Sequence, residues 1–363
     1  MTKRSSDRVR TVGKGRLGGE LWLLCLLALA LLGPVDLSAQ SNFYQGKTMT
    51  YVVGLLAGDS TDLWARAVSR NMVKHIPGNP AIIVQNMPGA GGLIAANYVY
   101  GVAKPDGLTL GSISAGHYFH QLAGRPEAQF DWRKFTWIGS SARHEYLLIM
   151  RADAPFKSID DIRSATEPPK CSATALGSAS HITLKLVEEA LGARLQIVTG
   201  YKGGSEQDLA IEKGEVQCRA VTTAAFVARE PFQTWQKNGF IRVLLQTPRK
   251  RNPRLPDVPT IYELMDRVRT PENKRRVALV LLGTDNFGNF PTVATPGIPA
   301  DRVKILRDAY AKALKDPDLL EEAKKRRWEV DYIEPQELEK LAKEVIDQPP
   351  DIVKRVKELL ESK

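Results

Sequence analysis

The sequence lacks several features that would indicate a membrane-embedded, metal-binding or nucleic-acid-binding protein. Its one long apolar run, Leu21 to Leu32, has 12 residues, whereas a transmembrane helix needs about 20. Its three cysteines and five histidines show no paired spacing typical of zinc sites. No Gly-x-Ser-x-Gly motif occurs, and the basic clusters at 249–251 and 274–276 contain no interleaved aromatic residues. We therefore expect no metal, no cofactor and no nucleic-acid partner.

The first 39 residues have the pattern of a secretory signal peptide. Six basic residues precede the apolar run, Gly33-Pro34 ends it, and Ser38-Ala39 offers a small-residue cleavage site. Cleavage near Ala39 leaves 324 of the 363 residues, with 45 basic and 38 acidic side chains and a net charge of +7. An uncleaved membrane anchor is the alternative, and the shortness of the run favours cleavage. We expect an exported, periplasmic protein.

Two cysteines, Cys171 and Cys218, remain after cleavage. An exported compartment permits a disulfide, and both residues lie in strand-like segments that a doubly wound lobe could place side by side. Neighbouring strands, however, often hold cysteines at a distance unsuited to bonding. The sequence leaves the disulfide open.

Short apolar strands alternate with helical patterns from Lys47 to residue 246, which predicts an α/β protein with parallel sheets and right-handed crossovers. A chain of this length normally makes two lobes. We expect residues 43–145 to begin lobe 1, residues 146–246 to form lobe 2, and residues 247–363 to return to lobe 1. The return starts with a proline-rich connection and ends in helices. The predicted strands are 50–56, 81–85, 108–113, 147–150, 171–174, 195–199, 216–221 and 240–245, and the main predicted helices are 63–75, 93–100, 181–191, 300–314, 316–327 and 334–360.

Two segments, Val52 to Arg66 and Thr174 to His181, lead an apolar strand through a turn of small and hydroxyl residues into a helix. Such a turn offers backbone N–H groups and hydroxyls at a helix N-terminus, where the macrodipole favours anions. Facing each other across a cleft, the two turns would hold a small carboxylate from both sides. An ordinary helix cap is the structural alternative for the first turn.

Other motifs are weaker. Asn86 to Gly92 resembles a dinucleotide fingerprint, but Ile94 stands where its third glycine belongs. The hydroxyls of 111–116 could reach the same cleft, and Tyr201 could border it. His117 and His120 lie three residues apart without an acidic partner at metal spacing, so we expect a structural role for them.

Taken in order, these segments resemble the extracytoplasmic solute receptors of the tripartite tricarboxylate transporter family, also called Bug-type receptors. Those receptors commonly carry P-F-A-A-G-G-S-T-D-x-x-A-R near the mature N-terminus, and each later match is weak singly while the ordered series is strong. The resemblance extends over residues 43–345. The matching segments are 54–66, 85–92, 105–110, 177–181, 201–204, 255–260 and 297–303.

The resemblance implies a two-lobed, type II periplasmic-binding-protein (Venus flytrap) fold that holds a carboxylate between two loops, with few charged side chains. The chain departs from the family pattern at Asp59, where a glycine is usual, at Gly54-Leu55, at Ala175-Leu176 and in 267–295, where 286–290 could replace the usual aromatic-glycine strand. Carried over to this sequence, the ligand-binding residues are Ala57, Gly58, Asp59, Ser60, Thr61, Asp62, Ser114, Thr174, Gly177, Ser178, His181 and Tyr201.

The resulting hypothesis is a monomeric periplasmic receptor that delivers a small organic acid to membrane transporter subunits by hinge closure. We expect no catalysis, because no nucleophile, base and orienting residue coincide in the motifs. Two alternatives stay open: a ligand sensor for a signalling partner, and a hydrolase that uses Ser178 with His181.

Overall fold

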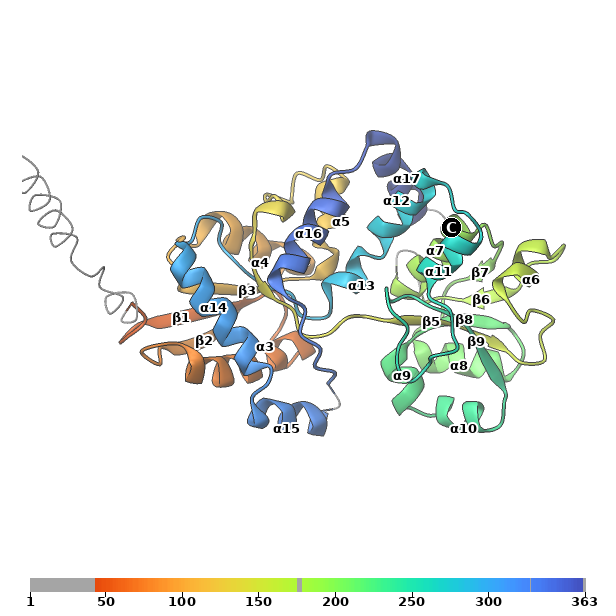
Figure 1. Ribbon diagram of the computed structural model, residues 1–363, viewed down its shortest axis with the longest axis horizontal. Helices are drawn as coiled ribbons and strands as arrows, with labels where there is room; N and C mark the ends of the chain where they lie inside the picture. Colours follow the sequence, from red (N-terminus) through yellow and green to blue (C-terminus); the bar gives the residue numbers. More distant parts are fainter. Residues whose placement is uncertain (1–42, 175–177, 327, 362–363) are drawn as a thin grey trace, which may run out of the picture. The chain divides into compact units, whose positions relative to one another are not determined.

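Two five-stranded sheets, each flanked by helices, form the body of the computed structural model (Figure 1). The structure describes residues 43–174, 178–326 and 328–361, so the predicted signal peptide lies outside the described residues. Residues Tyr44–Lys363 belong to one unit. Within the described ranges, no helix combines the length and the apolar character needed to cross a membrane.

The first sheet has the strand order β2-β1-β3-β10-β4. The inner strand β1 lies between β2 and β3, and its Tyr51, Val52 and Val53 are fully buried, as expected for a strand covered on both faces. The strands of this sheet are β1 (Thr48–Val53), β2 (Ala81–Asn86), β3 (Thr109–Ser112), β4 (Thr136–Gly139) and β10 (Thr292–Ala294).

The second sheet has the strand order β7-β6-β8-β5-β9. The inner strand β5, between β8 and β9, buries a run of apolar side chains, Leu147 to Met150. The strands of this sheet are β5 (Tyr146–Arg151), β6 (Lys170–Ser172), β7 (Gln196–Val198), β8 (Cys218–Thr222) and β9 (Ile241–Gln246).

The two-lobed α/β class is confirmed, and each sheet is mixed, with four of its five strands running in one direction. Strands β1, β2 and β3 are parallel, as are β6, β7 and β8, whereas β10 and β5 run antiparallel to their neighbours. The first residue of β10, Thr292, pairs with Ser112 at the end of β3, and Tyr146 of β5 pairs with Thr222 at the end of β8. A strand that starts beside the end of its neighbour must run in the opposite direction.

The disulfide that the sequence left open is present between Cys171 and Cys218. The two residues are register partners in the parallel pair β6–β8, their Cα atoms are 4.4 Å apart, and both are fully buried. The bond therefore joins two neighbouring strands inside the second lobe.

The helices after residue 247 divide between the two sheets instead of all returning to the first. Helix α14 packs on β4 and α3, and α16 packs on β4, whereas α12 and α17 pack beside α7 of the second lobe (Figure 1). The reason is the apolar face of α12, whose Val277, Ala278, Val280 and Leu281 are buried. The helices around the first sheet are α3 (Ser60–Met72), α4 (Leu93–Asn97), α5 (Tyr118–Leu122), α14 (Ala300–Ala313), α15 (Pro317–Arg326) and α16 (Pro335–Ile346).

The remaining helices lie on or near the second sheet, except α13, which leads into β10. They are α6 (Ile159–Ser164), α7 (Ala179–Leu191), α8 (Gly204–Glu212), α9 (Thr223–Ala228), α10 (Phe232–Lys237), α11 (Ile261–Arg267), α12 (Glu272–Leu281), α13 (Gly283–Phe287) and α17 (Pro350–Glu361). Short helical turns cover 73–75, 90–92, 98–102, 115–117 and 132–134.

The expectation that 286–290 replaces a family strand is wrong. Asn286 and Phe287 end α13, and the strand that joins the first sheet is β10, five residues further along. Phe287 is fully buried and stacks on Trp137, with ring centroids 5.1 Å apart, while Trp132 meets it edge-on at 5.2 Å. This aromatic packing keeps the segment helical and holds it against the core of the first lobe.

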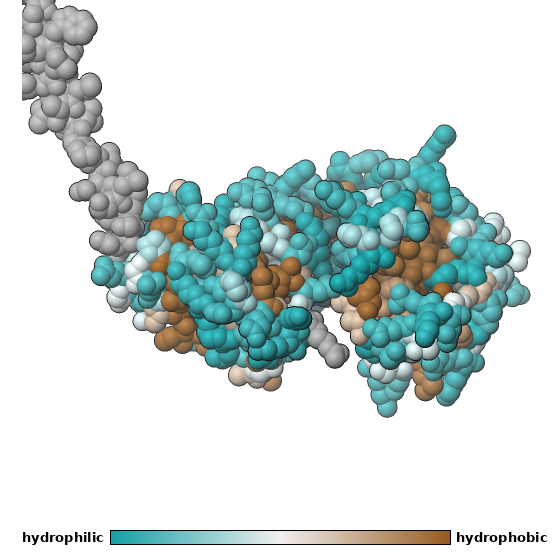
Figure 2. Space-filling view, turned by 60° about the horizontal axis from the view of Figure 1, so that its bottom comes forward, coloured by the Kyte–Doolittle hydropathy of each residue, from teal (hydrophilic) through white to brown (hydrophobic). Residues whose placement is uncertain are grey.

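Hydrophilic residues cover most of the face seen in Figure 2, with separate apolar patches between them. The large apolar side chains that remain exposed include Leu55 and Leu56 in the loop after β1, with exposed fractions of 37% and 69%. Both lie beside the turn that the sequence predicts to bind a ligand. The surface next to that turn is therefore apolar.

Candidate functional site

The loop between β1 and α3 is held by a side-chain cap at the helix N-terminus. Asp59 is the N-cap residue, and its Oδ1 accepts a hydrogen bond from the Thr61 backbone N–H at 3.1 Å. A helix cap is the structural alternative that the sequence leaves open for this turn, and the capping residue is Asp59 rather than Ser60, Thr61 or Asp62. The exposed Asp59 carboxylate therefore has a local partner and stands at the helix end where an anion would otherwise be favoured.

Asp62 organises the same loop from the inside. Its carboxylate is buried and accepts from the Gly58 N–H at 2.8 Å, from Asn86 Nδ2 at 3.0 Å and from Arg66 Nε at 3.0 Å. The Arg66 guanidinium, together with these hydrogen bonds, lowers the Asp62 pKa to about 2. Gly58 has φ +87°, which favours glycine. Asp62 thus fixes the loop, because its oxygen atoms are engaged by the protein itself.

Two further segments of the first lobe approach this loop. Gly91 and Gly92 open α4, and the carbonyl oxygen of Gly91 lies 3.0 Å from Nε2 of His117. Burial lowers the pKa of His117 to about 4, so its imidazole is neutral near pH 7. Because a carbonyl only accepts, Nε2 carries the proton, and the buried Nδ1 has no hydrogen-bond partner among the described residues.

Serine hydroxyls line the end of β3. Ser112 is its last residue, is 2% exposed, and has no partner for its Oγ among the described residues. Ser114 caps the next turn, since its Oγ accepts from the Gly116 N–H at 3.4 Å. The loop after β3 therefore brings one engaged hydroxyl and one available hydroxyl to the same place.

The segment that connects the second lobe back to β10 supplies the other side of the site. Asp285 on α13 accepts hydrogen bonds from Thr247 Oγ1 at 3.3 Å and from Thr284 Oγ1 at 3.4 Å. Burial raises the pKa of Asp285 to about 7. The backbone N–H of His144 donates to the Asp285 carbonyl at 3.1 Å, and burial lowers the pKa of the His144 imidazole.

Close packing sets the position of α13. A Cβ atom on Gly283 would lie 2.6 Å from the hydroxyl oxygen of Tyr118 and 2.9 Å from a methyl of Val345. The Tyr118 hydroxyl donates to the carbonyl of Val280 at 2.5 Å. With Phe287 packed between the two tryptophans, both ends of α13 are anchored, so Asp285 sits on a rigid support.

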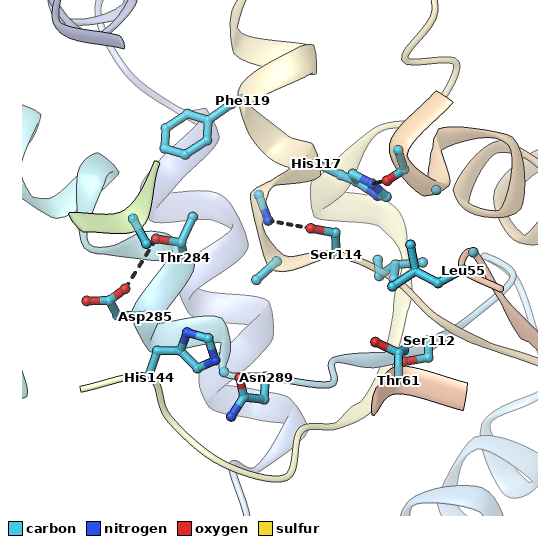
Figure 3. A pocket seen from close by; sticks show the side chains of 18 of the residues that line it. Leu55, Thr61, Ser112, Ser114, His117, Phe119, His144, Thr284, Asp285 and Asn289 are labelled. Atoms are coloured by element: carbon cyan, nitrogen blue, oxygen red, sulfur yellow. Dashed lines mark hydrogen bonds between the residues drawn. The ribbon is translucent and has the colours of Figure 1, made fainter. Parts of the chain in front are cut away.

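These elements enclose a cavity of about 430 Å³. Figure 3 shows Leu55, Thr61 and Ser112 on one side of it and His144, Thr284 and Asp285 on the other. Helix α7 of the second lobe adds Ala179 and Ile182, so both lobes contribute. The lining residues are Gly54, Leu55, Thr61, Gly91, Gly92, Ser112, Ile113, Ser114, Ala115, Gly116, His117, Phe119, His144, Ala179, Ile182, Thr284, Asp285, Gly288 and Asn289.

Of the predicted site residues, Thr61 and Ser114 line this cavity. Their neighbours in the first turn, 57–60 and Asp62, shape the loop without lining it, and Gly177 lies outside the described residues together with Ala175 and Leu176.

In the second turn, Ser178 Oγ accepts from the His181 backbone N–H at 3.3 Å, and the Thr174 N–H donates to Ser180 Oγ at 3.3 Å. His181 is buried, and burial lowers its pKa. Tyr201 is half-buried against the second-lobe core. The second predicted turn therefore leads into α7. Its described residues do not line the cavity, whereas Ala179 and Ile182 of α7 do.

Sequence reasoning missed His144, Thr284, Asp285 and Asn289. No local motif marks them, because they come from the connections between the two sheets and meet only through tertiary packing. The one available signal was that 267–295 departs from the family pattern. Among the described residues, no group of three or more His, Cys, Asp or Glu side chains could hold a metal ion.

The fold and the cavity define the class of two-lobed solute-binding proteins. Residues 64–357 match the tripartite tricarboxylate transporter family receptor, and the chain belongs to this family, which confirms the resemblance found in the sequence. The matched family is one of receptors, and the chain is a receptor of this kind and not an enzyme.

Several proteins of similar length resemble the chain in sequence or in fold. A UPF0065 protein from the gbd 5′ region of Cupriavidus necator is 29% identical, with 90% of this chain and 92% of that protein covered. A ligand-free TctC solute binding protein from Polaromonas is 20% identical and has a TM-score of 0.68, with 86% and 99% covered. MatC from Rhodopseudomonas palustris, solved with malate, is 24% identical and has a TM-score of 0.51, with 85% and 99% covered.

Proposed function

We propose that this receptor captures a small organic acid in the cavity lined by Thr61, Ser112 and Asp285 and delivers it to membrane transporter subunits. The observation that carries the proposal is the lining of the cavity. It combines small residues, hydroxyls and loop backbone, and no lysine or arginine stands among its lining residues in the described ranges. An acid held there would be bound by hydrogen-bond donors rather than by a fixed cation, in keeping with the malate of MatC and the adipate of a second R. palustris protein.

The proposed mechanism is hinge closure. Thr61 and Ser112 approach the ligand from the first lobe, and Ala179 and Ile182 approach it from the second. A ligand that contacts both lobes has more contacts when they meet, so it shifts the population toward the closed form. In this scheme Thr61 and Ser114 touch the ligand, whereas Asp62 acts by fixing the loop.

The decisive experiment is isothermal titration calorimetry of the mature protein with malate, succinate, glutarate and adipate. We expect at least one acid to bind, and Thr61→Ala to weaken that binding about ten-fold through the loss of one hydrogen bond to a charged group. The exposed Thr166→Ala is the matched control and should leave affinity unchanged. Binding of none of a broad set of small acids would contradict the proposal.

Export and delivery belong to the same proposal. The basic N-terminal region, the short apolar run and Ser38-Ala39 support cleavage and a periplasmic location. Cells that lack the protein should lose uptake of the acid identified by calorimetry and regain it with the wild-type gene, and protein from a periplasmic extract should begin at Gln40. If uptake is unchanged while transcription no longer responds to the acid, the receptor is a sensor instead.

A further inference from the structure

One carboxylate lines the cavity without a cation. The Asp285 carboxylate accepts only the two long hydroxyl hydrogen bonds from Thr247 and Thr284 among the bonds in the described ranges. No lysine, arginine or histidine forms an ion pair with it in that part of the chain, and the nearby charge is another acid, Glu145. The region around Asp285 is therefore electronegative.

The other ionisable groups near Asp285 do not change this balance. Tyr118 from α5, Tyr146 from β5 and Tyr262 from α11 all interact electrostatically with it, and each has a raised pKa that keeps it neutral. The neighbouring His144 is also neutral near pH 7, because burial lowers its pKa. Burial of a carboxylate without a cation costs free energy, and groups of this kind concentrate at functional sites.

A purely structural role does not require the charge. Thr247 Oγ1 lies 3.3 Å from Asp285 and accepts from the Tyr146 N–H at 2.9 Å, so this chain of hydrogen bonds ties α13 to β5. An asparagine could make the same contacts without the cost of a buried charge. The carboxylate is thus best explained by something that enters the cavity.

Besides Asp285, one more polar side chain of the cavity presents an acceptor without a donor in the described ranges. His117 has its proton on Nε2, so its buried Nδ1 can only accept, and it has no partner in the described ranges. Ser112 Oγ, also unpartnered there, can donate or accept. Asp285 lies on the side opposite Thr61 and Ser112 (Figure 3). A ligand with donors on one end and a carboxylate on the other matches this arrangement.

We infer that the ligand is an organic acid that also carries an ammonium group, and that Asp285 binds the ammonium while the carboxylate lies toward Thr61 and Ser112. This inference rests on the proposed receptor function and narrows its ligand class. The alternative is a protonated Asp285 that donates to a second ligand carboxylate, and Glu145 disfavours it because a further anion would be repelled.

The test compares acids that differ only in the amino group, by calorimetry at pH 8: glutamate with glutarate, alanine with propionate, and 4-aminobutyrate with butyrate. In at least one pair the amino acid should bind about ten-fold tighter, the gain expected for a charge-assisted hydrogen bond. Asp285→Asn should remove most of that preference, whereas Asp285→Glu should keep part of it. Asp351→Asn, the same change at an exposed position on α17, should leave it intact.

The outcomes separate the two proposals. If plain acids bind as well as or better than their amino partners in every pair, the ammonium inference is overturned while the acid receptor stands. Tighter binding of a plain acid as the pH falls below 7 would overturn it in the same way, because protonated Asp285 would then be the donor. If no acid of either kind binds, the receptor proposal itself fails.

Discussion

The loop after β1 and the crossing helix α13 each present one buried or half-buried carboxylate, and the two are treated in opposite ways. Asp62 has a guanidinium, an amide and a backbone N–H around it, and its pKa falls to about 2. Asp285 has only two hydroxyls as partners in the described ranges, and burial, helped by the neighbouring Glu145, raises its pKa to about 7. The Asp62 carboxylate fixes the conformation of the loop, whereas the Asp285 carboxylate remains available to a ligand in the cavity.

The largest change in the free energy of unfolding should come from removal of the Asp62 carboxylate. Asp62→Ala leaves the Gly58 N–H, Asn86 Nδ2 and Arg66 without their acceptor, and we expect a loss of about 3 kcal/mol in the free energy of unfolding. Urea denaturation at pH 7 measures it. Because the folded pKa is lowered, this stabilisation is complete above the unfolded value near 3.8 and is lost as the pH falls through 2. A change below about 0.5 kcal/mol at pH 7 would show that the network carries little stability.

A smaller effect of opposite sign should follow from Asp285→Asn. The folded pKa is raised to about 7 from 3.8, so the free energy of unfolding falls as the pH rises from 3.8 to 7, and the full cost is present above 7. A fully buried group with this shift would cost about 4 kcal/mol, and partial exposure to solvent reduces that to about 2 kcal/mol.

The variant should therefore be more stable than the wild type at pH 8, and the difference should vanish only below the unfolded pKa of 3.8, where Asp285 is protonated in both states. Urea denaturation at pH 8 and below pH 3.8, without ligand, measures this. Destabilisation at pH 8 would mean that the Asp285 charge is compensated inside the protein and is not reserved for a ligand.

The smallest effect on stability should come from substitution of Asp59, which is exposed, unlike Asp62 and Asp285. Asp59→Asn keeps a good N-cap, so the free energy of unfolding should change by less than about 0.5 kcal/mol. Removal of its charge from the N-terminus of α3 should raise affinity for a dicarboxylate about two- to three-fold at low ionic strength, and less at 0.2 M salt. Calorimetry at the two salt concentrations measures the difference. An equal gain at both would show that the effect is not electrostatic.

Local patterns in the sequence predicted the main helices, the family and eight of the ten strands, but not β4 and β10. The turn at 57–62 was predicted because a strand, a small-residue turn and a capped helix are contiguous, and Thr61 does line the cavity. Strand direction was not predictable in this way: β5 and β10 are antiparallel because the chain re-enters each sheet beside the end of a neighbour.

The far side of the cavity was missed for a related reason. Asp285 reaches it only because Gly283 lets α13 pack tightly against Tyr118 and because Phe287 stacks on Trp137. These contacts join positions far apart in the chain, and nothing in the local sequence around Asp285 indicates them. The division of the helices after 247 between the two sheets has the same origin, since α12 finds its partner α7 only in three dimensions.

The Cys171–Cys218 bond has a consequence for durability outside the cytoplasm. It closes the segment from 171 to 218 into a covalent ring that contains the turn before α7, Tyr201 and α8. A single cut by a protease anywhere within that ring leaves the two fragments joined at β6 and β8. A cut in the exposed parts of this segment would thus leave the chain in one piece.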